Sequence, residues 1–115
     1  MPYLNIQTNQ ALSPEAQEKL LSESSQLVAS ALGKSEDYMM VSIQDDTPML
    51  FGGKPAPTAF LEVNSLGIPA GKTKEICKQL CALLNSVADI PPERVYVKFN
   101  DVQRSMWGWK GNMFG

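Results

Sequence analysis

The chain consists of two similar halves, and this internal duplication constrains its fold more than any other feature. Residues 4–8 align with residues 61–65, and residues 37–45 align with residues 93–101 at nearly the same spacing. Helical patterns lie between the matched segments in both halves. A repeat of this length in only two copies indicates a duplicated supersecondary unit and not a solenoid. Each half is therefore expected to form a strand, a helix and a second strand.

One domain is expected over residues 1–115, with pseudo-repeats at about 2–57 and 58–115. This length can bury one hydrophobic core but is small enough to gain from oligomerisation. The net charge of −2 and the isoelectric point near 5.0 argue against a nucleic-acid partner. The sequence has neither an apolar run of membrane-spanning length nor a signal-peptide pattern, so we expect a cytoplasmic protein without a membrane partner.

Local signals define two helices. Ser13 before Pro14 predicts a helix start, because serine caps free N–H groups and proline suits the first helical position. Gly33 predicts the end of this helix, since glycine readily adopts the left-handed conformation that closes one. The second helix is predicted at about residues 73–88, where apolar residues recur at helical spacing. These are Ile76, Leu80, Leu83, Leu84 and Val87.

The predicted strands alternate between apolar and mixed polar residues. The side chains expected to face the helices are Leu4, Ile6, Met39, Val41, Ile43, Leu61, Val63, Val95, Val97 and Phe99. The opposite face carries Tyr3, Asn5, Gln7, Met40, Ser42, Gln44, Phe60, Glu62, Asn64, Tyr96, Lys98 and Asn100. Such a face meets water or lines a wet oligomer interior. Pro91 and Pro92 predict an extended entry into the last strand. The pattern predicts an α+β two-layer sandwich with two helices on one face of a four-stranded sheet.

The chain contains no histidine, so the usual side chain for proton transfer near neutral pH is missing. Pro2 follows Met1 directly, and removal of Met1 would leave a free secondary amine. Burial in an apolar site lowers the pKa of such an amine toward neutrality, which suits a general base. The structural alternative is that Pro2 only begins an edge strand, where a missing N–H costs nothing. A retained Met1 would block the amine.

The two cysteines, Cys77 and Cys81, are four residues apart in the second helical pattern. Both therefore project from one helix face, where they are expected to act as small apolar filler in a reducing compartment. The spacing excludes a CxxC redox pair, and no zinc site can be assembled without histidine. We expect neither a metal nor a cofactor.

Several short motifs follow one another along the whole chain in a characteristic order. They are Pro2, Thr8-Asn9, Gly33-Lys34, Tyr38, Phe51-Gly52-Gly53, Ser65-Leu66-Gly67, Pro92-Glu93-Arg94-Val95-Tyr96, Gly108-Trp109 and Phe114. Together they resemble the macrophage migration inhibitory factor family of the tautomerase superfamily, whose members use an amino-terminal proline. The resemblance runs from Pro2 to Phe114. It implies a symmetric homotrimer with active sites between subunits, and keto–enol tautomerisation of small acids such as phenylpyruvate and of dopachrome derivatives.

The resemblance also implies roles for individual residues. Pro2 would be the catalytic base, and Lys34 would hold the substrate carboxylate. The backbone N–H of Leu66 would bind a carbonyl or carboxylate oxygen. Tyr96 from the adjoining subunit would help to polarise the pocket. The apolar walls would be formed by Tyr38, Trp109 and Phe114.

Each of these roles has a structural alternative. Lys34 follows Gly33 and could serve only as a favourable charge at a helix C-terminus. Both tyrosines could be ordinary strand aromatics with satisfied hydroxyls. The aromatic residues of the tail could form a hydrophobic latch that pins the C-terminus; they are Trp107, Trp109 and Phe114.

The chain departs from the family pattern at three places. Lys98 stands where relatives carry an asparagine, and Trp107 replaces a small aliphatic residue. Both are therefore expected to alter the range of acids bound. Residues 58–61 read Thr-Ala-Phe-Leu where better-known relatives carry a cysteine pair, so thiol–disulfide oxidoreductase activity should not be carried over. The alternative function is a cytokine-like or regulatory binding protein with a vestigial pocket. Hydration or dehalogenation fits less well, because the chain has only two arginines, Arg94 and Arg104.

Overall fold

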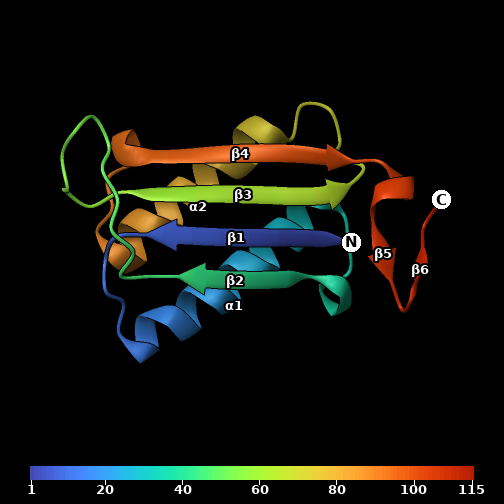
Figure 1. The fold of residues 1–115 in the computed structure, drawn as a ribbon, viewed down its shortest axis with the longest axis horizontal. Helices are drawn as coiled ribbons and strands as arrows, with labels where there is room; N and C mark the ends of the chain where they lie inside the picture. The colour runs from blue at the N-terminus through green and yellow to red at the C-terminus, as the bar shows by residue number, and fades with distance from the viewer.

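Two helices cover one face of a four-stranded sheet in the computed structural model, which describes residues 1–115 (Figure 1). The strands are β1 (Pro2–Thr8), β2 (Met40–Gln44), β3 (Ala59–Leu66) and β4 (Val95–Val102). They lie in the order β2-β1-β3-β4. Within each β-α-β unit the two strands are parallel, β1 with β2 and β3 with β4. The two units meet at β1 and β3, which are antiparallel. This confirms the α+β sandwich and the duplicated strand, helix and strand.

Both helices have the predicted limits. Helix α1 (Pro14–Leu32) begins at Ser13, whose Oγ accepts a hydrogen bond of 3.1 Å from the backbone N–H of Ala16. It ends at Gly33 with a φ of 66°, which a residue with a Cβ would adopt only at a cost. Helix α2 spans Thr73–Ala88. Neither helix is at once long and apolar enough to cross a membrane.

The hydrophobic core lies between the helices and the sheet. Its fully buried members include Leu4 and Ile6 from β1, Leu61 and Val63 from β3, and the helix residues Leu20, Ile76, Leu80 and Leu84. The other strand residues predicted to face the helices pack against this cluster and are partly buried. The predicted alternation is therefore confirmed. Each fully buried leucine or isoleucine contributes about 1.5–3 kcal/mol to folding by leaving water.

Three regions differ from the simple strand pattern. Tyr38 lies not on a strand but in a 3-10 turn, η1 (Glu36–Tyr38), before β2 begins. Pro91 is extended as expected, but Pro92–Arg94 then form a second 3-10 turn (η2) before β4 begins. After β4 the tail forms a third 3-10 turn, η3 (Arg104–Met106), and a hairpin of β5 (Gly108–Trp109) and β6 (Asn112–Met113). Both residues of the hairpin turn have positive φ, the geometry that matches the twist of paired strands. The hairpin lies beyond the end of the sheet, beside the N-terminus (Figure 1).

The cysteines lie on α2 as predicted. Cys81 is buried and Cys77 half-buried, and both are free thiols. Burial, together with the neighbouring Cys77, raises the pKa of the Cys81 thiol to about 11. The thiol form is therefore kept at neutral pH, which agrees with a packing role.

Candidate functional site

Several elements meet at one end of the sheet and enclose two adjoining cavities. Strands β1 and β2 begin there, strands β3 and β4 end there, and the C-terminal hairpin lies beside them (Figure 1). The end of α1 and two 3-10 turns, at residues 36–38 and 104–106, add further lining residues. The larger cavity has a volume of about 700 Å³ and is lined by Pro2, Tyr38, Trp107 and Trp109, among others. The smaller cavity, of about 520 Å³, is lined by Met1, Lys34, Tyr38, Leu66, Gly67, Arg104 and Phe114. Met1 and Tyr38 border both.

Seven of the nine predicted site residues therefore line these two cavities. They come from distant parts of the chain and are Pro2, Lys34, Tyr38, Leu66, Trp107, Trp109 and Phe114. The remaining two, Tyr96 and Lys98, line neither cavity. The duplication explains this convergence, because the two halves bring the start of β1 and the end of β3 side by side in an antiparallel pair.

Strand and helix ends fix the polar groups. Pro2 is buried at the first position of β1, opposite Ser65 of β3. Lys34 follows α1, and its backbone N–H donates a hydrogen bond of 2.8 Å to the carbonyl of Ala29. This bond fixes the backbone from which the half-buried lysine side chain reaches the cavity. Both positions therefore depend on regular structure and not on loops.

The turn after Leu66 is held by a carboxylate. Asp101 of β4 accepts hydrogen bonds from the backbone N–H groups of Gly67 at 3.0 Å and Ile68 at 3.3 Å. Asp101 lies opposite Ser65 in the register of β3 and β4. The backbone around Leu66 is thus tied to the sheet on one side and to this carboxylate on the other.

An aromatic cluster forms the apolar walls. The rings of Tyr38 and Trp109 meet edge to face with centroids 5.7 Å apart, and Trp109 and Phe114 stack at 6.2 Å. The tail is also pinned through its backbone, because the N–H of Phe114 donates to the carbonyl of Trp107 at 3.2 Å. The aromatic residues of the tail therefore both pin the C-terminus and line the cavities. The two interpretations of these residues are compatible.

The charge around the N-terminus favours a neutral amine. Burial, and then the positive charge of Lys34, hold the pKa of the Met1 amino group below its ordinary value of 8.0. Asp37 borders the larger cavity, and no carboxylate lines the smaller one. No three histidine, cysteine, aspartate or glutamate side chains lie together so as to hold a metal ion.

Tyr96 lies toward the other end of the sheet, and Lys98 lies near the middle of β4. Tyr96 is opposite Phe60 on β3, five positions before the Ser65 that pairs with Pro2, which corresponds to roughly 16 Å along the strand. Its ring is 61% exposed and packs on Phe51 with centroids 5.0 Å apart. Lys98 lies opposite Glu62 on the open face. Within one protomer, neither residue reaches Pro2.

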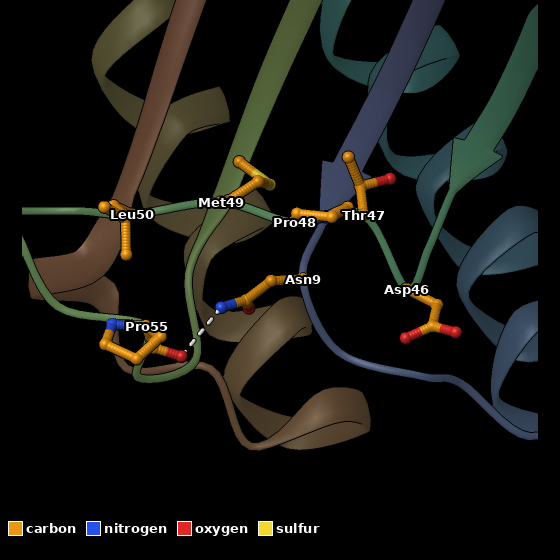
Figure 2. A pocket seen from close by; sticks show the side chains of 7 residues that line it. All are labelled: Asn9, Asp46, Thr47, Pro48, Met49, Leu50 and Pro55. Carbon is orange, nitrogen blue, oxygen red and sulfur yellow. Dashed lines mark hydrogen bonds between the residues drawn. The ribbon is translucent and has the colours of Figure 1, made fainter.

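A third cavity, of about 470 Å³, opens at the end of the sheet opposite Pro2. Figure 2 shows its lining, with the amide of Asn9 directed at the carbonyl of Pro55. Asn9 also donates to the carbonyl of Ala56 and accepts from the N–H of Thr58, so it holds the loop between β2 and β3. Asp46 is the one titratable side chain in this lining, with no cation or base beside it.

Sequence reasoning missed several lining residues. Arg104 borders the smaller cavity, and Asp37, Asn64 and Met106 border the larger one. No spacing or periodicity marks Arg104, because the turn that carries it follows the last strand of the duplicated pattern.

The fold indicates the class of protein to which this chain belongs. A duplicated β-α-β sandwich, with two helices on a four-stranded mixed sheet, is the fold of the tautomerase superfamily. The family model described as macrophage migration inhibitory factor matches residues 1–115, and the chain belongs to that family.

Similar proteins come from distant organisms. Macrophage migration inhibitory factor of Xenopus tropicalis is 34% identical over 115 residues, covering 99% of each chain. The crystal structure of a macrophage migration inhibitory factor homologue from Prochlorococcus marinus is 38% identical, with a TM-score of 0.93 over 98% of this chain and 99% of that one. The corresponding protein of Toxoplasma gondii is 32% identical, with a TM-score of 0.91 over 97% and 99% of the two chains.

Proposed function

We propose that this protein is a keto–enol tautomerase that acts on enolisable α-keto acids such as phenylpyruvate, and on dopachrome-type compounds. The observation that carries the proposal is the burial of Pro2 at a cavity that adjoins Lys34, in a chain without histidine. Removal of Met1 turns the Pro2 nitrogen from an amide into a secondary amine. That amine is the general base.

A working base must be neutral at the pH of the cell. The amino group at this end of β1 already has a lowered pKa because of burial and Lys34. Pro2 is itself buried, so desolvation acts on its amine in the same direction once Met1 is gone. A pKa near the operating pH gives the best compromise between a free lone pair and basicity.

The substrate acid and its reacting oxygen need separate partners. Lys34 binds the carboxylate through a charge-assisted hydrogen bond. The backbone N–H of Leu66 binds the carbonyl or carboxylate oxygen, and the Asp101 contacts keep the neighbouring turn in place. Negative charge that develops on the enolate oxygen is stabilised best by donors already fixed in position.

The apolar walls keep water away from the reacting carbon. Tyr38, Trp109 and Phe114 form one continuous aromatic cluster beside the two cavities. Trp107 adds a second indole, which narrows the larger cavity and selects against bulky acids. Exclusion of water strengthens the interaction of Lys34 with a bound carboxylate.

The site is completed by a second subunit. Tyr96 is exposed and distant from Pro2 within its own protomer, so it can serve the site of a neighbour in a homotrimer. Lys98 lies two residues further along the same open face and adds a cation to that shared site. This cation lowers the pKa of the Pro2 amine further.

A second candidate is a cytokine-like or regulatory binding protein, which the names of its relatives favour. In that case the cavities are vestigial and substitutions at Lys34 leave the biological activity unchanged. A Lys34→Ala protein that loses tautomerase turnover but still binds a protein partner as the wild type does would favour this candidate.

The test is phenylpyruvate turnover by protein whose amino terminus has been shown by mass spectrometry to be Pro2. Lys34→Ala should weaken the use of the acid by about 1.5–3 kcal/mol in kcat/KM, the value of a charge-assisted hydrogen bond. The methyl ester of the same compound should be affected much less. Lys78→Ala, at an exposed position of α2, is the matched control. Equal losses on acid and ester would show that Lys34 is structural, and no turnover of either would refute the proposal.

A further inference from the structure

The smaller cavity is lined by two cations and no carboxylate. The cations are Lys34 and Arg104, and the rest of the lining consists of Met1, Tyr38, Leu66, Gly67 and Phe114. The one salt bridge in the protein joins Lys19 and Glu23 on α1, so neither cation of the cavity is neutralised by an ion pair. We call this space the dibasic cavity. Two unpaired cations beside one cavity create a positive potential that attracts anions.

Arg104 keeps most of its hydrogen-bonding capacity free. Its Nε donates to the carbonyl oxygen of Phe114 at 3.2 Å, and its two terminal nitrogens make no hydrogen bond to the protein. The bond from Nε ties the guanidinium to the backbone of Phe114, a residue that also lines the cavity. Two parallel N–H donors are thereby left for a planar carboxylate, the partner that a guanidinium matches best.

The other arginine shows what a purely structural guanidinium does in this fold. Arg94 uses Nε and both terminal nitrogens to donate to backbone carbonyls of Phe51, Lys54, Ala56 and Pro57. All three of its nitrogens are occupied. In Arg104, which borders a cavity, only one of the three nitrogens makes a hydrogen bond to the protein.

We propose that the dibasic cavity selects α-keto acids that carry a second carboxylate. The inference rests on the proposed function and specifies its substrate class. Lys34 binds the carboxylate next to the keto group, and Arg104 binds the distal carboxylate with its free terminal nitrogens. Arg104 is therefore a specificity residue. The cavity volume of about 520 Å³ accommodates a small diacid.

The experiment compares two keto acids with the same carbon chain that differ in one charge. They are 2-oxoglutarate and its distal methyl ester, in which the second carboxylate is replaced by a neutral group that leaves the keto group free. Dissociation constants are measured by NMR titration of the Pro2-terminated protein. Deuterium exchange at the carbon next to the keto group is followed in the same samples. Arg104→Gln removes the distal cation, Arg104→Lys retains a positive charge, and Lys78→Gln removes an equal charge from the exposed face of α2.

The wild type should bind the diacid about tenfold more tightly than the distal ester, as expected for one charge-assisted hydrogen bond. Arg104→Gln should abolish this preference, Arg104→Lys should restore part of it, and Lys78→Gln should leave it intact. Arg104→Gln should weaken phenylpyruvate binding much less than diacid binding, which excludes a loosened tail as the cause. Equal affinity for the diacid and its distal ester, or equal weakening of every ligand by Arg104→Gln, would overturn the inference. Selective binding without deuterium exchange would leave the inference standing and count against the tautomerase proposal.

Discussion

Lys34 and the amino group at the start of β1 influence each other through their charges. The lysine disfavours the protonated amine, and its removal should therefore let the pKa of that amine rise. In the Pro2-terminated protein, kcat/KM rises with pH as the amine loses its proton. Lys34→Gln should move this rise to higher pH, because the amine with the higher pKa loses its proton only at a higher pH.

The measurement is the pH profile of kcat/KM on the ester of phenylpyruvate, which does not require Lys34 for carboxylate binding. Lys78→Gln provides the control for a simple change of net charge. A profile that stays in place, or moves to lower pH, would contradict the coupling between Lys34 and the Pro2 amine.

At the scale of elements, Asn9 connects the end of β1 to the loop between β2 and β3. Its side chain makes four hydrogen bonds: it donates to two carbonyls of that loop, and it accepts from the N–H of buried Thr58 and from the Gln10 side chain. Asn9→Ala should lower the free energy of unfolding by about 1–3 kcal/mol, because the buried N–H of Thr58 loses its partner. Urea denaturation measures the loss, and hydrogen exchange at Thr58 locates it.

Asn85→Ala is the matched control, since Asn85 is exposed on α2. It should change stability by no more than about 0.5 kcal/mol, as usual for surface positions. An Asn9 variant as stable as this control would show that the loop holds without the asparagine.

The elements themselves could be predicted because their signals are local. Ser13, Pro14 and Gly33 act on their own backbone, and the period-two alternation of the strands reports burial directly. The turn at Pro92–Arg94 and the C-terminal hairpin could not be predicted in the same way. The hairpin depends on positive φ at Lys110 and Gly111 and on packing of Trp109 against Tyr38, a contact between residues far apart in the sequence.

The candidate site was predictable only in part. Its cavity-lining residues Pro2, Lys34 and Leu66 stand beside strand or helix ends that the pattern defines. Arg104 could not be found, because a charged residue in an irregular tail resembles any solvated surface residue until the fold returns that tail to the N-terminus. The placement of Tyr96 at a shared site still depends on the assembly.

At the scale of the whole molecule, the open face of the sheet predicts a trimer. Met40 is 66% exposed and Tyr96 61% exposed, although both are large apolar side chains on strands. The two edge strands, β2 and β4, also have unpaired outer edges. A closed cyclic assembly covers both features. Analytical ultracentrifugation should give a trimer at micromolar concentration, and a stable monomer would contradict the shared site.

Subunit mixing tests the shared site further. A Met1-retained protein and a Tyr96→Ala protein should each turn over phenylpyruvate poorly. When the two are co-assembled, some interfaces combine a free Pro2 from one subunit with an intact Tyr96 from its neighbour. Turnover should therefore be partly restored. If mixed trimers form but phenylpyruvate turnover is not restored, Tyr96 does not serve the site of a neighbouring subunit.

The most direct test of the enzyme proposal compares protein that begins at Pro2 with protein that retains Met1. Retention makes the Pro2 nitrogen an amide, which is not a base, and leaves the rest of the fold in place. Pro2→Gly keeps a free amine without the ring and should retain a fraction of the activity. Phenylpyruvate turnover should be abolished in the Met1-retained form and present in the Pro2-terminated form of the same oligomeric state. Equal turnover by the two forms would show that Pro2 is not the base.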